Sequence, residues 1–118
     1  MLVIRSEQLA VFGEWRESDF RSRLFNHLVE LRAHHRLSLT DRELGQQMER
    51  GLASGRRFFT SEIDLVRYID IVITRMGGWS DTDHPPKVMR LLGGRSLPGA
   101  RRLDSLEHWL LRRGRVHA

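Results

Sequence analysis

Apolar residues recur every three or four positions along most of the chain, which is the spacing of an amphipathic helix. The first stripe starts after Ser6, runs to about Arg36 and consists of Leu9, Phe12, Phe20, Leu24, Leu28 and Leu31. A continuous helix over this stretch would be roughly 45 Å long. The pattern therefore predicts one long N-terminal helix, in which Gly13 is a point of bending.

A second helix is predicted to begin at a capping box. Thr40 and Glu43 stand three residues apart, so each side chain can bond the backbone N–H of the other residue. Gly55 is typical of a helix C-terminus and ends this second element. The turn that follows contains Phe58 and Phe59, which we expect to fill the core.

The third predicted helix is the most apolar and is expected to be the central one. Thr60 or Ser61 caps its N-terminus, and the pair Gly77–Gly78 ends it. We expect one buried face, formed by Ile63, Val66, Ile69, Ile73 and Met76 and widened by Leu65, Tyr68 and Val72.

The last apolar stretches predict two further helices. One covers residues 86–92, and the other opens at Ser96 and Pro98, with a face made of Leu103, Leu106 and Leu110. No alternating stretch is long enough for a sheet. We therefore expect an all-α fold, a compact bundle of four to five helices with one long N-terminal helix. This bundle would form a single domain over residues 1–118.

Charge is spread unevenly along this pattern. The chain has a formal net charge of +5. Residues 95–118, the predicted basic C-terminal helix and tail, contain six arginines and two acidic residues and so have a net charge of +4. Such an arginine-rich end is either a solvated surface or a contact surface for a partner. Cysteine is absent, which excludes disulfides and thiolate metal sites.

The stretch GWSDTDHPP at residues 78–86 holds the densest group of chemically active side chains. Asp81, Asp83 and His84 are metal-ligand types, but the sequence has neither EF-hand spacing nor a second ligand cluster. Asp and Ser also favour turns, and a residue before proline is pushed out of helical geometry. We therefore interpret the stretch as a corner between two helices and expect no metal.

Motifs for catalysis and for membrane insertion are missing from the sequence. It contains no G-x-S-x-G, P-loop, HExxH or cysteine nucleophile, so we expect no catalytic residue, no cofactor and no enzymatic activity. No apolar run approaches membrane-spanning length, and the first residues are too charged for a signal-peptide core. The sequence thus predicts a cytoplasmic protein with no membrane partner.

Nucleic-acid binding is one alternative that the basic composition raises. The second and third helices are joined by too long a connection for a helix-turn-helix, and the third helix has carboxylates that phosphates would repel. What remains is non-specific contact through the arginines of the C-terminal segment, which are Arg101, Arg102, Arg112, Arg113 and Arg115.

Protein binding is the other alternative. The chain has three tryptophans, and the stripes described above require none of them. Tryptophan and arginine are both enriched in protein–protein interfaces. We predict two contact regions, the connection between the third and fourth helices and the last helix, with partner-binding residues Trp79, Asp81, Asp83, Trp109, Arg112 and Arg113.

Four short segments, in this order, resemble one known family. They are VIRSEQL at 3–9, RYIDIVI at 67–73, DTD at 81–83 and RLDSL at 102–106. Together they are similar to a family of small helical bacterial proteins encoded beside type VI secretion effectors, often near PAAR-repeat tips and effector chaperones. The similarity extends over nearly the whole chain.

The resemblance implies an accessory role. Such a protein would help an effector, or the dedicated chaperone of that effector, to load onto the secretion apparatus, and it would do so without catalytic residues. The partner would then be the effector or its chaperone. An immunity protein that blocks a toxin is a third alternative, although immunity proteins against basic toxins are often acidic and this chain is basic.

Overall fold

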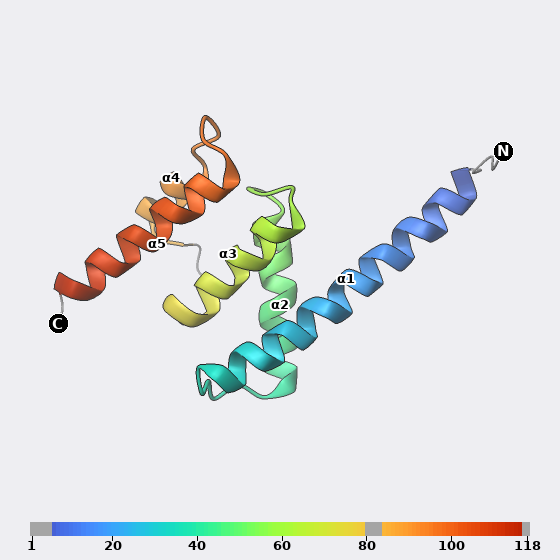
Figure 1. Cartoon of the computed structure of the whole chain (residues 1–118), viewed down its shortest axis with the longest axis horizontal. Helices are drawn as coiled ribbons and strands as arrows, with labels where there is room; N and C mark the ends of the chain where they lie inside the picture. The colour runs from blue at the N-terminus through green and yellow to red at the C-terminus, as the bar shows by residue number, and fades with distance from the viewer. Residues whose placement is uncertain (1–5, 80–83, 117–118) are drawn as a thin grey trace. The chain divides into compact units, whose positions relative to one another are not determined.

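The computed structural model of the 118-residue chain describes residues 6–79 and 84–116. These residues form five helices and no strand, namely α1 (Ser6–His34), α2 (Asp41–Gly55), α3 (Glu62–Arg75), α4 (Pro86–Leu92) and α5 (Gly99–Val116) (Figure 1). The predicted all-α fold of four to five helices with a long N-terminal helix is confirmed.

The chain divides into two compact units, residues 1–44 and 45–118. The first unit holds α1, the turn after it and the first turn of α2. The second holds the rest of α2 together with α3, α4 and α5. The assignment of residues 1–118 to one domain stays a prediction.

The turn between α1 and α2 is fixed by side chains of the first unit. Thr40 and Glu43 form the predicted capping box, in which the Glu43 carboxylate accepts from the Thr40 N–H and the Thr40 hydroxyl from the Glu43 N–H, each at 3.1 Å. The bond from the Thr40 backbone lowers the pKa of Glu43. Arg32 donates to the Leu39 carbonyl at 3.1 Å and to Asp41 at 2.7 Å. These contacts explain why a new helix begins here.

In the second unit, α5 packs against both α3 and α4 (Figure 1). The core of this unit is entirely apolar except for the hydroxyl of Tyr68. Its buried side chains are Met48, Leu52, Phe59, Leu65, Tyr68, Ile69, Ile71, Val72, Ile73, Val88, Leu92, Leu103 and Leu106. Six of them come from α3, more than from any other helix of this unit, while the central position of α3 stays a prediction.

The predicted buried face of α3 was wrong at its first position. Ile63 is 80% exposed, whereas Tyr68 is fully buried. The two residues are five positions apart, which places them about 140° apart around a helix. A spacing of three or four residues fits several faces of so apolar a helix, and Tyr68, the largest fully buried side chain, marks the face that is buried.

Arg102, at the start of α5, bonds the turn after α2, the last residue of α4 and the loop between α4 and α5. Its guanidinium donates to the carbonyl oxygens of Phe58 at 2.9 Å, Leu92 at 2.7 Å and Leu97 at 3.2 Å. It also lies over the ring of Phe59, 4.9 Å from the centroid. An arginine that the sequence placed in a basic tail is therefore part of the framework.

Candidate partner-binding surfaces

The α3–α4 connection begins with two glycines in the left-handed region, Gly77 with φ 77° and Gly78 with φ 89°. The Gly78 N–H donates to the Val72 carbonyl at 2.9 Å, which closes the end of α3. A Cβ at Gly78 would lie 2.6 Å from Oε1 of Gln47. Position 78 therefore needs glycine for its backbone angles and for space.

Beyond these glycines, the backbone of Trp79 is held by the side chain of Gln47. The Trp79 N–H donates to Gln47 Oε1 at 2.7 Å, and Gln47 Nε2 donates to the Trp79 carbonyl at 3.1 Å. Arg50 donates to the same carbonyl at 3.4 Å. One amide side chain thus satisfies both polar groups of this residue, as a neighbouring strand would in a sheet.

Close packing brings the Trp79 indole against the helices of the second unit. A Cβ at Gly51 would lie 2.9 Å from Cη2 of Trp79, so α2 needs glycine where the indole approaches. The Trp79 ring lies edge-on to Tyr68, with centroids 5.7 Å apart. Its Nε1 is buried and has no hydrogen-bond partner among the described residues. The indole therefore packs against other residues of the second unit.

The other side of the connection is held by the same tyrosine. The Tyr68 hydroxyl bonds Ser54 Oγ at 2.7 Å and His84 Nε2 at 2.7 Å. Burial raises the pKa of the Tyr68 hydroxyl, and the hydrogen bond with Ser54 opposes this rise only in part. Because Tyr68 contacts both Trp79 and His84, one buried residue fixes the two described sides of the corner.

The predicted site residues of the corner therefore fall into two groups. The structure places Trp79 half-buried, and places His84 in a hydrogen bond with the core. Asp81 and Asp83 lie outside the described residues. Within the described ranges, no three His, Asp or Glu side chains come together as a metal site requires. The roles assigned to Trp79, Asp81 and Asp83 in partner binding stay predictions.

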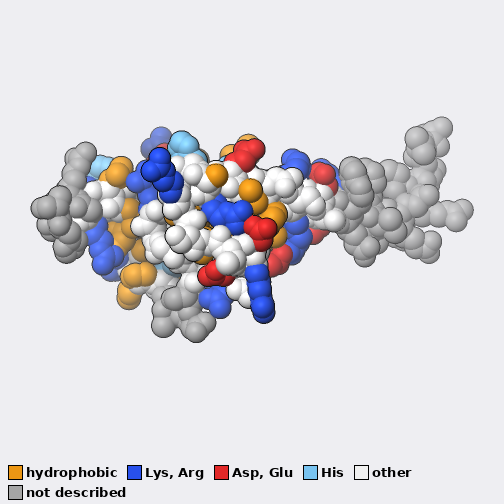
Figure 2. All heavy atoms as spheres, turned by 90° about the horizontal axis from the view of Figure 1, so that it is seen from below, with side chains coloured by type: hydrophobic (Ala, Val, Ile, Leu, Met, Phe, Trp, Pro, Cys, Tyr) orange, Lys and Arg blue, Asp and Glu red, His pale blue; other side chains and the backbone are white. Residues whose placement is uncertain are grey.

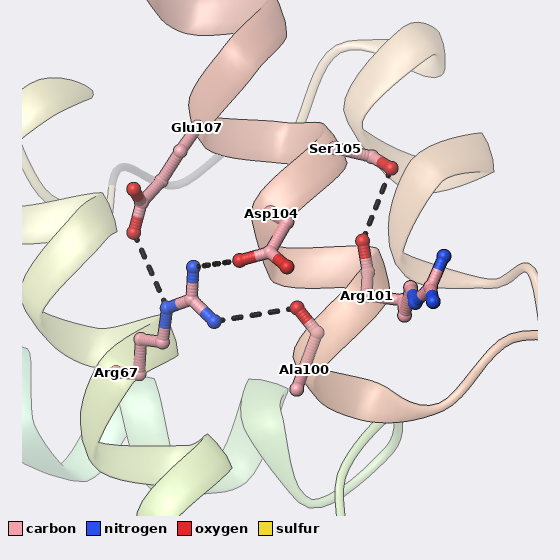
Figure 3. Close-up of polar contacts among 6 residues, drawn as sticks. All are labelled: Arg67, Ala100, Arg101, Asp104, Ser105 and Glu107. Carbon is pink, nitrogen blue, oxygen red and sulfur yellow. Dashed lines mark hydrogen bonds and ion pairs between the residues drawn. The ribbon is translucent and has the colours of Figure 1, made fainter.

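The two carboxylates in the first half of α5 bond an arginine of α3. Arg67 of α3 donates to the Asp104 carboxylate, to Glu107 at 3.3 Å and to the Ala100 carbonyl at 3.3 Å (Figure 3). The hydrogen bond with Asp104 is the main cause that raises the pKa of Arg67, while partial burial opposes it. The charge of Arg67 is thus neutralised within the fold.

The second half of α5 differs in both polarity and exposure. Leu111 is 47% exposed, and Trp109 and Leu110 are half-buried. Arg112 and Arg113 are exposed, and neither forms an ion pair with a described residue. Arg113 lies over the Trp109 ring, 5.4 Å from the centroid. Hydrophobic and basic side chains also appear together on the surface toward the end where α5 finishes (Figure 2).

Three of the six predicted partner-binding residues therefore lie together on one helix. Trp109, Arg112 and Arg113 occupy little more than one turn of α5. The sequence missed Gln47, Tyr68 and Arg102 as organising residues. Apart from the bond between Arg102 and Leu97, their bonds join residues that are 10 to 44 positions apart, and no local spacing reports such bonds.

Comparison with known proteins adds no relative to this description. The chain matches no protein-family model, and neither the curated proteins nor the solved structures contain a significantly similar chain. Within the described part of the chain, every helix is too short or too polar to cross a bilayer.

Proposed function

We propose that this protein is a non-enzymatic adaptor or co-chaperone that binds another protein through the second half of α5. By its resemblance to proteins encoded with type VI secretion effectors, the partner would be an effector or the chaperone of that effector. The observation that carries the proposal is the surface formed by Trp109, Leu110, Leu111, Arg112 and Arg113, which we call the α5 end surface.

Two features of the α5 end surface support a contact role. Tryptophan and arginine are enriched in protein interfaces, and here they lie beside an exposed leucine. The arginines have no ion pair within the described fold, so a partner can pair with them without breaking an existing ion pair. By contrast, Trp79 and Arg102 are already engaged inside the second unit.

Co-expression tests the proposal. The tagged protein is produced together with the products of the genes beside its own, purified, and passed over a size-exclusion column. We expect one neighbouring product to elute with it in a defined ratio. A Trp109→Ala/Leu111→Ala variant should lose that product while keeping its helical circular dichroism. Elution of the wild-type protein alone in every combination would refute the proposal.

A matched control variant separates this surface from exposed apolar residues in general. Ile63 is 80% exposed, on the N-terminal turn of α3. Ile63→Ala removes a comparable apolar group outside the α5 end surface. We expect this variant to keep the co-eluting partner.

A further inference from the structure

We propose that the α5 end surface binds an acidic amphipathic segment of a partner protein. The inference rests on the proposed function and adds the chemistry of the partner. A line of leucines runs along one side of α5. Leu103 and Leu106 are fully buried, and Leu110 lies seven residues after Leu103 on the same side of the helix but is only half-buried.

The apolar face of α5 is wider in the second half of the helix. Trp109, Leu110 and Leu111 are consecutive, so they span about 200° of the helix circumference. A single packed seam covers a narrower stripe than this. Leu111 consequently remains 47% exposed. Together the three side chains form a small apolar patch around one turn of the helix, against which the apolar face of a partner helix can pack.

The charge of the α5 end surface indicates that the partner segment is acidic. From residue 108 to residue 116 the sequence HWLLRRGRV contains three arginines and no carboxylate. The two acidic residues of α5 beyond its first turn, Asp104 and Glu107, are already bonded to Arg67. The cations of the second half therefore have no local counter-charge on their own helix, and carboxylates beside an apolar stripe are complementary to them.

The same composition argues against two other occupants. A nucleic acid would use the arginines but would leave Leu110 and Leu111 exposed to water. An anionic membrane would accept the leucines, but stable surface binding takes a longer apolar face than one turn of helix provides. A short protein segment uses both features at once.

The size of the α5 end surface sets the expected affinity. The surface is little more than one helical turn long. The area that it can bury is therefore far below the ~800 Å² that each side of a stable complex buries. We therefore expect a transient contact with a Kd on the order of 10 to 100 µM for a single segment. Higher affinity in a complete complex would need contacts outside this surface.

The probe is a synthetic helical peptide of about 18 residues with leucines on one face and glutamates on the other. A matched peptide carries lysine in place of every glutamate. Titration of the ¹⁵N-labelled full chain should shift the Trp109 indole signal and the amides around Leu111. Affinity for the glutamate peptide should exceed that for the lysine peptide by about tenfold and should fall as salt is added.

Two double variants test where the glutamate peptide binds. Arg112→Glu/Arg113→Glu should weaken it by about tenfold or more, and Arg112→Gln/Arg113→Gln by an intermediate factor. Arg95→Glu/Arg101→Glu makes the same change in net charge at two other exposed positions and should change affinity less than about twofold. Unchanged circular dichroism shows that α5 is still folded in each variant.

Several results would overturn the inference. These are equal affinity for the two peptides, equal loss in both glutamate variants, or no shift at about 1 mM peptide. A stronger response to anionic phospholipid vesicles or to a DNA duplex would replace the protein segment with that class of partner. If the co-expressed partner stays bound to Arg112→Glu/Arg113→Glu, the acidic segment is wrong, and the proposed function then stands only if Trp109→Ala/Leu111→Ala still loses that partner. If the glutamate peptide binds at α5 but no neighbouring product co-elutes, the proposed function fails alone.

Discussion

The two halves of α5 contain similar residue types, but these residues are buried and bonded in the first half and exposed in the second. In the first half, Leu103 and Leu106 are fully buried, and Arg102 has three carbonyl partners. In the second half, Leu111 is 47% exposed, and Arg112 has no ion pair with a described residue. One continuous helix thus changes from a structural element to a free surface within a few turns.

The difference shows that the type of a residue, such as arginine or leucine, does not reveal whether that residue stabilises the fold or lies free on the surface. Arg102 and Arg112 both belong to the basic C-terminal segment, yet only the contacts of the folded chain separate them. The same holds for the α3–α4 corner, where Trp79 and His84 are occupied by Gln47 and Tyr68. A partner-binding surface is therefore expected where side chains make few contacts within the fold.

The largest expected effect is the difference in stability between truncating Leu106 in the first half of α5 and truncating Leu111 in the second half. Leu106→Ala leaves a cavity in the core and should lower the free energy of unfolding by about 3 kcal/mol. Leu111→Ala should change it by less than about 0.5 kcal/mol. Urea unfolding followed by circular dichroism measures both values. Equal losses at the two positions would remove the distinction between the halves of α5.

The arginines should follow with a smaller difference. Arg102→Ala removes hydrogen bonds to three carbonyl groups and should cost about 2 kcal/mol, because some of those oxygens are left without a partner. Arg112→Ala should be neutral within about 0.5 kcal/mol. The same unfolding assay applies, and Arg102→Lys is the control that keeps the charge but loses the planar fork. A neutral Arg102→Ala would contradict the framework role.

The corner between α3 and α4 should show an effect of about 1 kcal/mol. Gln47→Ala removes both hydrogen bonds that hold the Trp79 backbone, in a partly buried place. Gln47→Glu keeps the acceptor for the Trp79 N–H but loses the donor for its carbonyl, so it should fall between Ala and wild type. Unfolding midpoints rank the three proteins, and a Gln47→Ala protein as stable as wild type would show that the clamp contributes nothing.

The smallest effect concerns the hydroxyl of Tyr68, the only tyrosine of the chain. Burial raises its pKa, so the folded chain holds this proton at a pH where the unfolded chain releases it. Stability from this group is complete below the unfolded pKa of about 10 and is lost as pH rises through the folded pKa. Tyrosinate absorbance should therefore appear at higher pH in the folded chain than in urea, and identical curves would contradict a buried hydroxyl.

The sequence predicts local features of this fold well. The Thr40–Glu43 capping box, the helix over residues 86–92 and the glycines that end α3 all depend on neighbours within a few positions, and the structure confirms each one. Capping and backbone geometry are local, which is why short spacings report them.

Burial and long-range bonds could not be read in the same way. The exposure of Ile63 depends on which side of α3 meets its neighbours, and an apolar helix has several suitable sides. Gln47 and Tyr68 form hydrogen bonds with residues 14 to 32 positions away. The sequence named Trp109, Arg112 and Arg113, which lie together on α5, and the structure gives the exposure of Leu111 beside them.

The central claim is that the second half of α5 is surplus to the fold and serves a partner. The most direct measurement is affinity purification from the cells that produce the protein, with quantitative mass spectrometry, for wild type and for two double variants. The account predicts that one protein is retained by wild type and by Arg95→Glu/Arg101→Glu and is lost from Arg112→Glu/Arg113→Glu, with all three equally folded. Retention by both variants, or loss from both, would contradict it.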